Sequence, residues 1–258
     1  MSFTFVNVIH IERSRRVADR RTERIDAILE QALDIVQSEG FDALTLQRLA
    51  HSLGLVTTAL YRYFPSKDAL SAALQRRAIA DVHAHFQAEQ RAALDAWSDA
   101  HEATSAVAEL LLSASLYLGL PRSKPRAWFF IALLLGDPRP LLSDGEAMKT
   151  GPLFLGFLGE VTASFERATR TGALSPGSAQ ERVLGYWAAL HGALCLEKAR
   201  RLAPVLPAPE GIGMSAARGL LESWGASAPR LVAAERLVAE VVPSVVAKID
   251  SPKKGRAK

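Results

Sequence analysis

The sequence predicts an all-α protein. Apolar residues recur at three- and four-residue intervals along most of the 258 residues, and glycines and prolines separate these stretches. No stretch shows the convincing alternation of apolar and polar residues that would require strands. With 49% hydrophobic and 22% charged residues, the chain can bury a sizeable core and has the length of one or two domains.

The first predicted helix carries one apolar stripe and ends at Gly40, where a left-handed C-terminal residue is expected. The stripe consists of Ile25, Ile28, Leu29, Ala32 and Val36.

Arginines precede or open this helix: Arg13, Arg15, Arg16, Arg20, Arg21 and Arg24. Such an arm can follow phosphates or enter a minor groove, or it can simply keep the protein in solution; both readings stay open. The first ten residues lack the features of a secretory signal, so we expect them to be a leader segment upstream of the DNA-binding helices. The formal net charge of +4 favours a polyanionic partner but also fits an ordinary soluble protein.

The second and third predicted helices form a helix-turn-helix motif. Thr45 is placed to cap the second helix, whose apolar positions are Leu46, Leu49, Ala50 and Leu53. Gly54 ends it, and a turn of three or four residues leads into a third helix from Thr57 to Tyr63, with Leu60 and Phe64 facing the core. A connection this short makes the two helices cross steeply.

Polar side chains remain on the outer face of the third helix: Thr57, Thr58, Tyr61, Arg62 and Tyr63. Their hydroxyl, phenol and guanidinium groups suit base edges and phosphates, so we interpret this face as a DNA reader. The alternative is a solvated helix face.

Pro65 ends the third helix and Ser66 caps the next. That fourth helix is expected to connect two domains, residues 1–66 and 67–258. The remaining chain predicts helices at about 66–97, 101–118, 125–135, 145–170, 179–201, 214–224 and 229–248.

The segment GLVTTALYRYFPSKDAL resembles the signature of the TetR/AcrR family, G-V-S-x-x-x-L-Y-x-Y-F-x-x-K-x-x-L, and TLQRLAHSLG resembles its preceding helix. The resemblance covers the first third of the chain. It implies an all-helical homodimer with an N-terminal DNA-binding domain and a ligand-binding and dimerisation domain behind it. A small molecule would then loosen the grip on a double-stranded DNA operator.

The same resemblance assigns DNA contacts by position. Thr45 and Gln47 open the second helix, Thr57, Thr58 and Arg62 face bases, and Tyr61, Tyr63 and Lys67 face phosphates. Two residues depart from the family pattern. Val56 replaces a capping Ser or Thr, so the cap is missing or comes from Thr57, and Ala59 removes one expected phosphate contact.

The helix QERVLGYWAALHGALCLEKARRL carries small residues that let another helix approach: Gly185, Ala188, Ala189, Gly192 and Ala199. They suit either a partner subunit or packing inside one subunit. We favour this helix and the last one as the homodimer contact, including Leu231, Val238, Val241 and Val242.

An effector pocket is expected among the aromatic residues Trp128, Phe129, Phe130, Phe154, Phe157, Tyr186 and Trp187. These side chains are equally suited to an ordinary core. His191 either orients a small hydrophobic effector or satisfies a backbone carbonyl.

We identify no catalytic motif, metal site or cofactor, and His83 and His85 lie two residues apart on different helix faces. The single Cys195, between Leu194 and Leu196, is expected to be buried and inert. No apolar run is long enough to span a membrane. The sequence therefore predicts a cytoplasmic, ligand-responsive transcriptional regulator, and the family resemblance implies a repressor. The alternative is a DNA-bound structural or interaction protein of the same fold without an effector.

Overall fold

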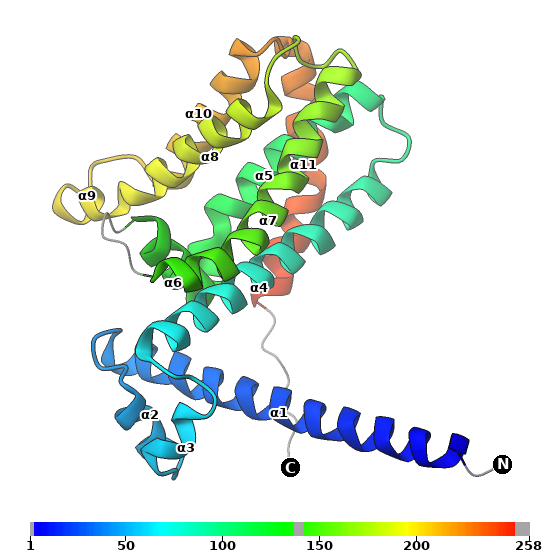
Figure 1. Ribbon diagram of the computed structural model, residues 1–258. Coiled ribbons are helices and arrows are strands. Elements are labelled where there is room, and N and C mark those ends of the chain that lie inside the picture. Colours follow the sequence, from blue (N-terminus) through cyan, green and yellow to red (C-terminus); the bar gives the residue numbers. More distant parts are fainter. Residues whose placement is uncertain (1–2, 137–141, 251–258) are drawn as a thin grey trace. The chain divides into compact units, whose positions relative to one another are not determined.

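The computed structural model describes residues 3–136 and 142–250, and most of these residues are helical (Figure 1). No strand occurs in this described part, in agreement with the predicted fold class. The helices are α1 (Phe3–Glu39), α2 (Leu46–Ser52), α3 (Thr57–Tyr61), α4 (Lys67–Ala96), α5 (Glu102–Ser123), α6 (Pro125–Gly136), α7 (Asp144–Arg170), α8 (Ala179–Cys195), α9 (Glu197–Leu202), α10 (Pro209–Ser223) and α11 (Ala228–Asp250).

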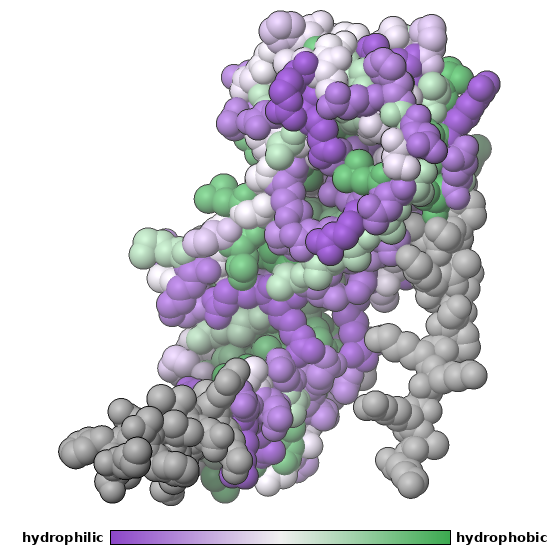
Figure 2. All heavy atoms as spheres, turned by 90° about the vertical axis from the view of Figure 1, so that its right-hand side faces the viewer, coloured by the Kyte–Doolittle hydropathy of each residue, from purple (hydrophilic) through white to green (hydrophobic). Residues whose placement is uncertain are grey.

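The described residues group into two compact units. The first contains those of 1–77 and 132–150, and the second those of 78–131 and 151–258. Helices α4, α6 and α7 therefore contribute residues to both units. On the face in Figure 2, hydrophilic side chains are interspersed with small apolar groups, as expected where most large apolar residues are buried in the core.

The core of the first unit contains the predicted stripe of α1. Ile28 and Ala32 are fully buried, and Ile25 at the edge of the stripe is half-buried. Gly40 has a φ of +89°, so it ends α1 in the left-handed conformation that was predicted. The arginine-rich segment continues α1 as one helix, but the side chains of residues 1–18 lie outside the described part.

The second unit is built around α5, most of whose residues are buried. Helix α11 packs along α5, and α10 packs against both α8 and α5. Among the described residues α5 is also the one helix long and apolar enough to cross a membrane, yet 78% of its apolar window is buried inside the protein.

Some helix boundaries differ from those predicted. Helix α5 continues through Pro121 to Ser123, because the fully buried Leu120 holds its last turn in the core. Helix α10 begins at Pro209 rather than near Met214, since proline at the first position is already in a helical conformation. The long helix predicted over 179–201 divides into α8 and the short α9.

The expectation that α11 presents Leu231 and Val238 to a partner subunit is wrong. Leu231 is fully buried and Val238 is buried, in a helix that packs along α5 of its own chain. An apolar stripe has the same spacing whether it covers its own core or another subunit, so the sequence did not separate the two. Val241 is half-buried, and the side chain of Val242 lies outside the described part.

Candidate nucleic-acid interface and effector pocket

The helix-turn-helix is fixed by short-range backbone contacts. The hydroxyl of Thr45 accepts a hydrogen bond of 3.0 Å from the backbone N–H of Arg48, which makes Thr45 the predicted cap of α2. Gly54 follows α2 with a φ of +64°, and the N–H of Leu55 donates to the carbonyl of Ala50 at 2.9 Å. The turn between α2 and α3 is therefore held in one conformation.

Helix α3 is anchored by its apolar side. Leu60 is fully buried and Phe64 is 5% exposed. The N–H groups of Tyr63 and Phe64 both donate to the carbonyl of Leu60, at 2.9 and 3.0 Å. Regular helix ends at Tyr61, two residues earlier than expected, and Arg62 is its C-terminal cap.

The outer side of α3 carries the predicted polar groups. Thr58, Tyr61 and Arg62 are exposed, whereas Thr57 and Tyr63 are half-buried. Thr45 and Gln47, at the start of α2, are also exposed. All these side chains belong to the first unit, and none of them lies in its core.

Val56 occupies the N-cap position of α3 and supplies no side-chain hydrogen bond. Of the two alternatives raised by the sequence, the missing cap is therefore correct, because Thr57 already lies inside the helix. The valine side chain is 70% exposed.

Two cations of the first unit lie over aromatic rings. The ammonium of Lys67 lies 5.1 Å from the ring centre of Phe41 and 3.5 Å from the Phe41 carbonyl oxygen. The guanidinium of Arg21 lies 5.7 Å from the ring centre of Tyr63. Aromatic faces thus hold two positive charges on the unit that carries α3.

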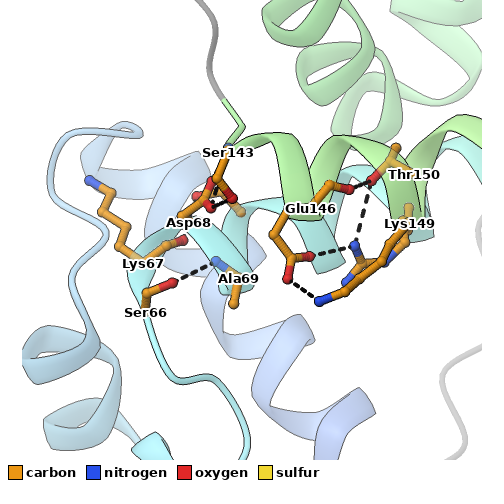
Figure 3. A network of polar contacts seen from close by, with 10 residues as sticks. Ser66, Lys67, Asp68, Ala69, Ser143, Glu146, Lys149 and Thr150 are labelled. Carbon is orange, nitrogen blue, oxygen red and sulfur yellow. Dashed lines mark hydrogen bonds and ion pairs between the residues drawn. The ribbon is translucent and has the colours of Figure 1, made fainter.

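The start of α4 is fastened to the start of α7 within the first unit (Figure 3). The Ser143 hydroxyl donates to the carboxylate of Asp68 at 2.6 Å, and Ser66 caps α4 by accepting from the N–H of Ala69 at 3.0 Å. Asp68 and Ser143 are 75 residues apart in the sequence, so this contact exists only in the folded chain.

An ion-pair cluster lies beside this contact. The carboxylate of Glu146 accepts from Lys149 at 2.7 Å and from Arg76 at 2.8 Å. Both hydrogen bonds lower the pKa of Glu146, and the bond from Lys149 has the larger effect. Arg76 also reaches the hydroxyl of Thr150 at 3.5 Å. We name the Asp68–Ser143 contact and this cluster together the α4–α7 fastening.

A hollow lies in the second unit between α4, α5, α7 and α8. It is small, with room for about two water molecules. Its lining is apolar and aromatic: Phe86, Ser113, Tyr117, Phe157, Leu158, Val161, Val183, Tyr186, Trp187 and Leu190.

Three of the predicted effector residues line this hollow: Phe157, Tyr186 and Trp187. The other five, Trp128, Phe129, Phe130, Phe154 and His191, do not line it. Phe86 and Tyr117 were missed, because isolated aromatic residues on α4 and α5 carry no sequence signal that separates lining from core.

Three polar side chains meet at one end of the hollow, and the buried Nε2 of His191 has no hydrogen-bond partner among the described residues. The indole N–H of Trp187 donates to the phenol oxygen of Tyr117 at 2.9 Å, and that oxygen lies 2.9 Å from Nδ1 of His191. Since indole can only donate, the Tyr117 proton points to Nδ1, so this nitrogen accepts and cannot satisfy a backbone carbonyl, one of the two alternatives raised for His191. Burial lowers the pKa of His191 and raises that of Tyr117, so both groups stay neutral.

Cys195 is exposed, which corrects the expectation of a buried thiol. It lies at the end of α8 on an outer stripe of small and apolar residues, while Leu194 beside it points inward. The exposed members of this stripe are Leu184, Gly185, Ala188, Gly192 and Cys195. The neighbouring α10 exposes Gly211, Ser215 and Gly219.

Comparison with known proteins agrees with this arrangement. The family described as bacterial regulatory proteins, tetR family, matches residues 28–74, which include α2, α3 and the start of α4. The chain is 31% identical over 177 residues to the HTH-type transcriptional regulator RutR of Escherichia coli K12, covering 69% of this chain and 74% of RutR.

Two solved structures share the fold. A protein of unknown function from Rhodococcus sp. RHA1 has a TM-score of 0.59 and 20% identity, over 78% of this chain and 94% of that one. The structure of RolR in complex with resorcinol has a TM-score of 0.54 and 16% identity, over 86% of this chain and 96% of that one.

Proposed function

Because the chain belongs to the TetR family of bacterial regulatory proteins, we propose that it is a repressor released from its operator by a small apolar or aromatic effector. Members of this family are DNA-binding transcriptional regulators that act as dimers, and the family is not one of enzymes. The observation that carries the proposal is the buried Leu60, which anchors α3 with its polar side outward, in a unit separate from the one that holds the hollow.

In the proposed complex, α3 enters the major groove. Thr57, Thr58 and Arg62 face base edges, because they lie on or directly after the helix that a helix-turn-helix inserts there. Phosphate contacts come from Tyr61, Tyr63 and Lys67, with Thr45 and Gln47 at the start of α2. The hydroxyl of Thr45 still has its proton to donate while it accepts from Arg48.

We propose that α8 and α10 form the dimer contact. Both helices expose small residues, such as Ala188 and Gly192 on α8 and Gly219 on α10, and the two helices pack against each other. A pair with a smooth outer face can join a second pair as a four-helix contact. Two α3 helices must lie about 34 to 36 Å apart to read one turn of DNA, which requires such a dimer.

The lining of the hollow supports an apolar or aromatic effector. The hydroxyl of Ser113 donates to the Glu109 carbonyl and accepts from Gln90, and Tyr117 is paired with Trp187 and His191. The lining therefore offers few free hydrogen-bonding groups to a charged or highly polar ligand.

The space for about two waters is too small for such an effector, so we expect binding to move the lining helices. A ligand shifts a conformational equilibrium only through its different affinity for the two states, and a hundredfold preference is worth about 2.7 kcal/mol. Helix α7 runs from the first unit, where Glu146 belongs to the α4–α7 fastening, into the second unit, where Phe157 and Val161 line the hollow. Gly151 and Pro152 lie between them, and proline removes one helix hydrogen bond there.

The test has two stages. Duplexes selected from random DNA by the full chain define an operator, and its complex is then titrated with toluene, naphthalene and indole while calorimetry follows binding. We expect at least one probe to bind and weaken the DNA complex. Val161→Leu, which takes up part of the hollow without exceeding it, should weaken this response and leave DNA affinity unchanged. If no probe both binds and weakens the complex, the effector part of the proposal fails.

The alternative is a DNA-bound structural protein of the same fold. The small size of the hollow favours it, because a packed core needs no ligand. A selected operator together with no response to any probe would support this alternative. In either case the partner is DNA, so we propose that the protein acts in the cytoplasm.

A further inference from the structure

Val56 is the apolar residue that directly precedes α3, the helix proposed to enter the major groove. Its side chain is 70% exposed and makes no hydrogen bond. Single exposed apolar residues are common on protein surfaces, so exposure alone indicates nothing. The position of Val56 is what distinguishes it, because the N-terminal residues of a recognition helix are those that contact base edges.

The backbone at Val56 is held on both sides. Its carbonyl accepts from the N–H of Ala59 at 2.9 Å, and the N–H of the preceding Leu55 donates to Ala50 at 2.9 Å. Valine is branched at Cβ, which restricts its side chain to few rotamers. Its methyl groups are thus presented at the start of α3 with little freedom to turn away.

Valine gives this position an apolar group in place of a hydroxyl. Serine or threonine at an N-cap would accept a hydrogen bond from the first turn of α3, and valine cannot. Valine can neither donate to a phosphate nor pair with the donors and acceptors of a base. The apolar group that base edges offer in the major groove is the C5-methyl of thymine.

We propose that Val56 contacts the C5-methyl of one thymine in each half of the operator and so sets a preference for that base. Cytosine at the same place offers no methyl and would bring its amino group toward an apolar side chain. A contact with deoxyribose is the rival reading, and it would give affinity without base preference. The inference rests on α3 entering the major groove, as proposed above.

The experiment removes only the methyl group. In a duplex selected by the wild-type chain, each thymine of one half-site is replaced in turn by deoxyuridine, which keeps base pairing intact. We expect one position at which wild-type affinity falls about fourfold, the effect of one methyl-sized apolar contact. Val56→Ala should bind the thymine duplex more weakly and show no difference between thymine and deoxyuridine there.

Two controls keep this result specific. His51→Ala, which alters an exposed side chain of α2 with no proposed DNA contact, should retain the thymine preference at that position. Val56→Ser restores a capping hydroxyl, so it should fold at least as well as the wild type and still lose the preference. Thermal unfolding followed by circular dichroism checks the folding of all three variants.

The outcomes separate this inference from the proposed function. Equal affinity of the wild type for every thymine and deoxyuridine duplex would overturn it, as would an unchanged preference in Val56→Ala. In both cases DNA binding itself would stand. If the wild type selects no duplex at all, the proposed DNA reading fails and the role of Val56 fails with it.

Discussion

Lys67 offers a quantitative test of the DNA interface. Its side chain is exposed at the start of α4, its ammonium lies 5.1 Å from the Phe41 ring centre, and no carboxylate of the described residues forms an ion pair with it. We expect Lys67→Ala to weaken binding to all duplexes alike, because a phosphate contact carries no base information. The substitution leaves the buried residues of the unit untouched.

The magnitude follows from counterion release. Each phosphate contact contributes about 0.9 to the slope of log affinity against log salt concentration, so a dimer that loses two contacts has a slope shallower by about 1.8. Over a fourfold rise in salt, from about 50 to about 200 mM, the affinity gap between wild type and Lys67→Ala should therefore close by about twelvefold.

Fluorescence anisotropy of a labelled duplex at several salt concentrations measures this slope. Lys198→Ala on α9 is the matched control, since it removes an exposed lysine from the second unit and should leave the slope unchanged. Arg62→Ala should instead relax base preference, by about 1 to 3 kcal/mol for one paired base. A Lys67→Ala slope equal to that of the wild type, or a base-dependent loss, would refute the assignment.

Three further substitutions test other parts of the structure. Leu60→Ala should cost about 2 to 5 kcal/mol of unfolding free energy, because Leu60 is fully buried; urea unfolding followed by circular dichroism measures it, and a cost below about 1 kcal/mol would contradict the anchoring of α3. The lowered pKa of Glu146 adds stability that is present above the unfolded-state pKa of about 4.3 and is lost as the pH falls through the folded-state value. Glu146→Gln should therefore flatten the acid side of the stability curve, and an unaltered pH dependence would show that its ion pairs add nothing. Ala188→Arg places like charges across the proposed α8–α10 contact and should give monomers in sedimentation, whereas Ala163→Arg, on an exposed site of α7, should leave the dimer intact.

The first unit was largely predictable from its sequence, because short-range signals determine it. Gly40 and Gly54 end helices in a left-handed conformation that few other residues adopt, and Thr45 caps α2 with its own hydroxyl. The spacing of Leu60 and Phe64 placed the polar residues of α3 outward. Each signal acts within a few residues, so one sequence suffices to recognise it.

The tertiary structure alone decided which apolar face meets which neighbour. The stripe of α11 covers α5 of its own chain, while Cys195 lies on the open face of α8, and both stripes have ordinary helical spacing. The lining of the hollow and the bond between Asp68 and Ser143 unite side chains far apart in the sequence. Helical periodicity fixes which residues share a face, but the partner of that face depends on how the whole chain packs.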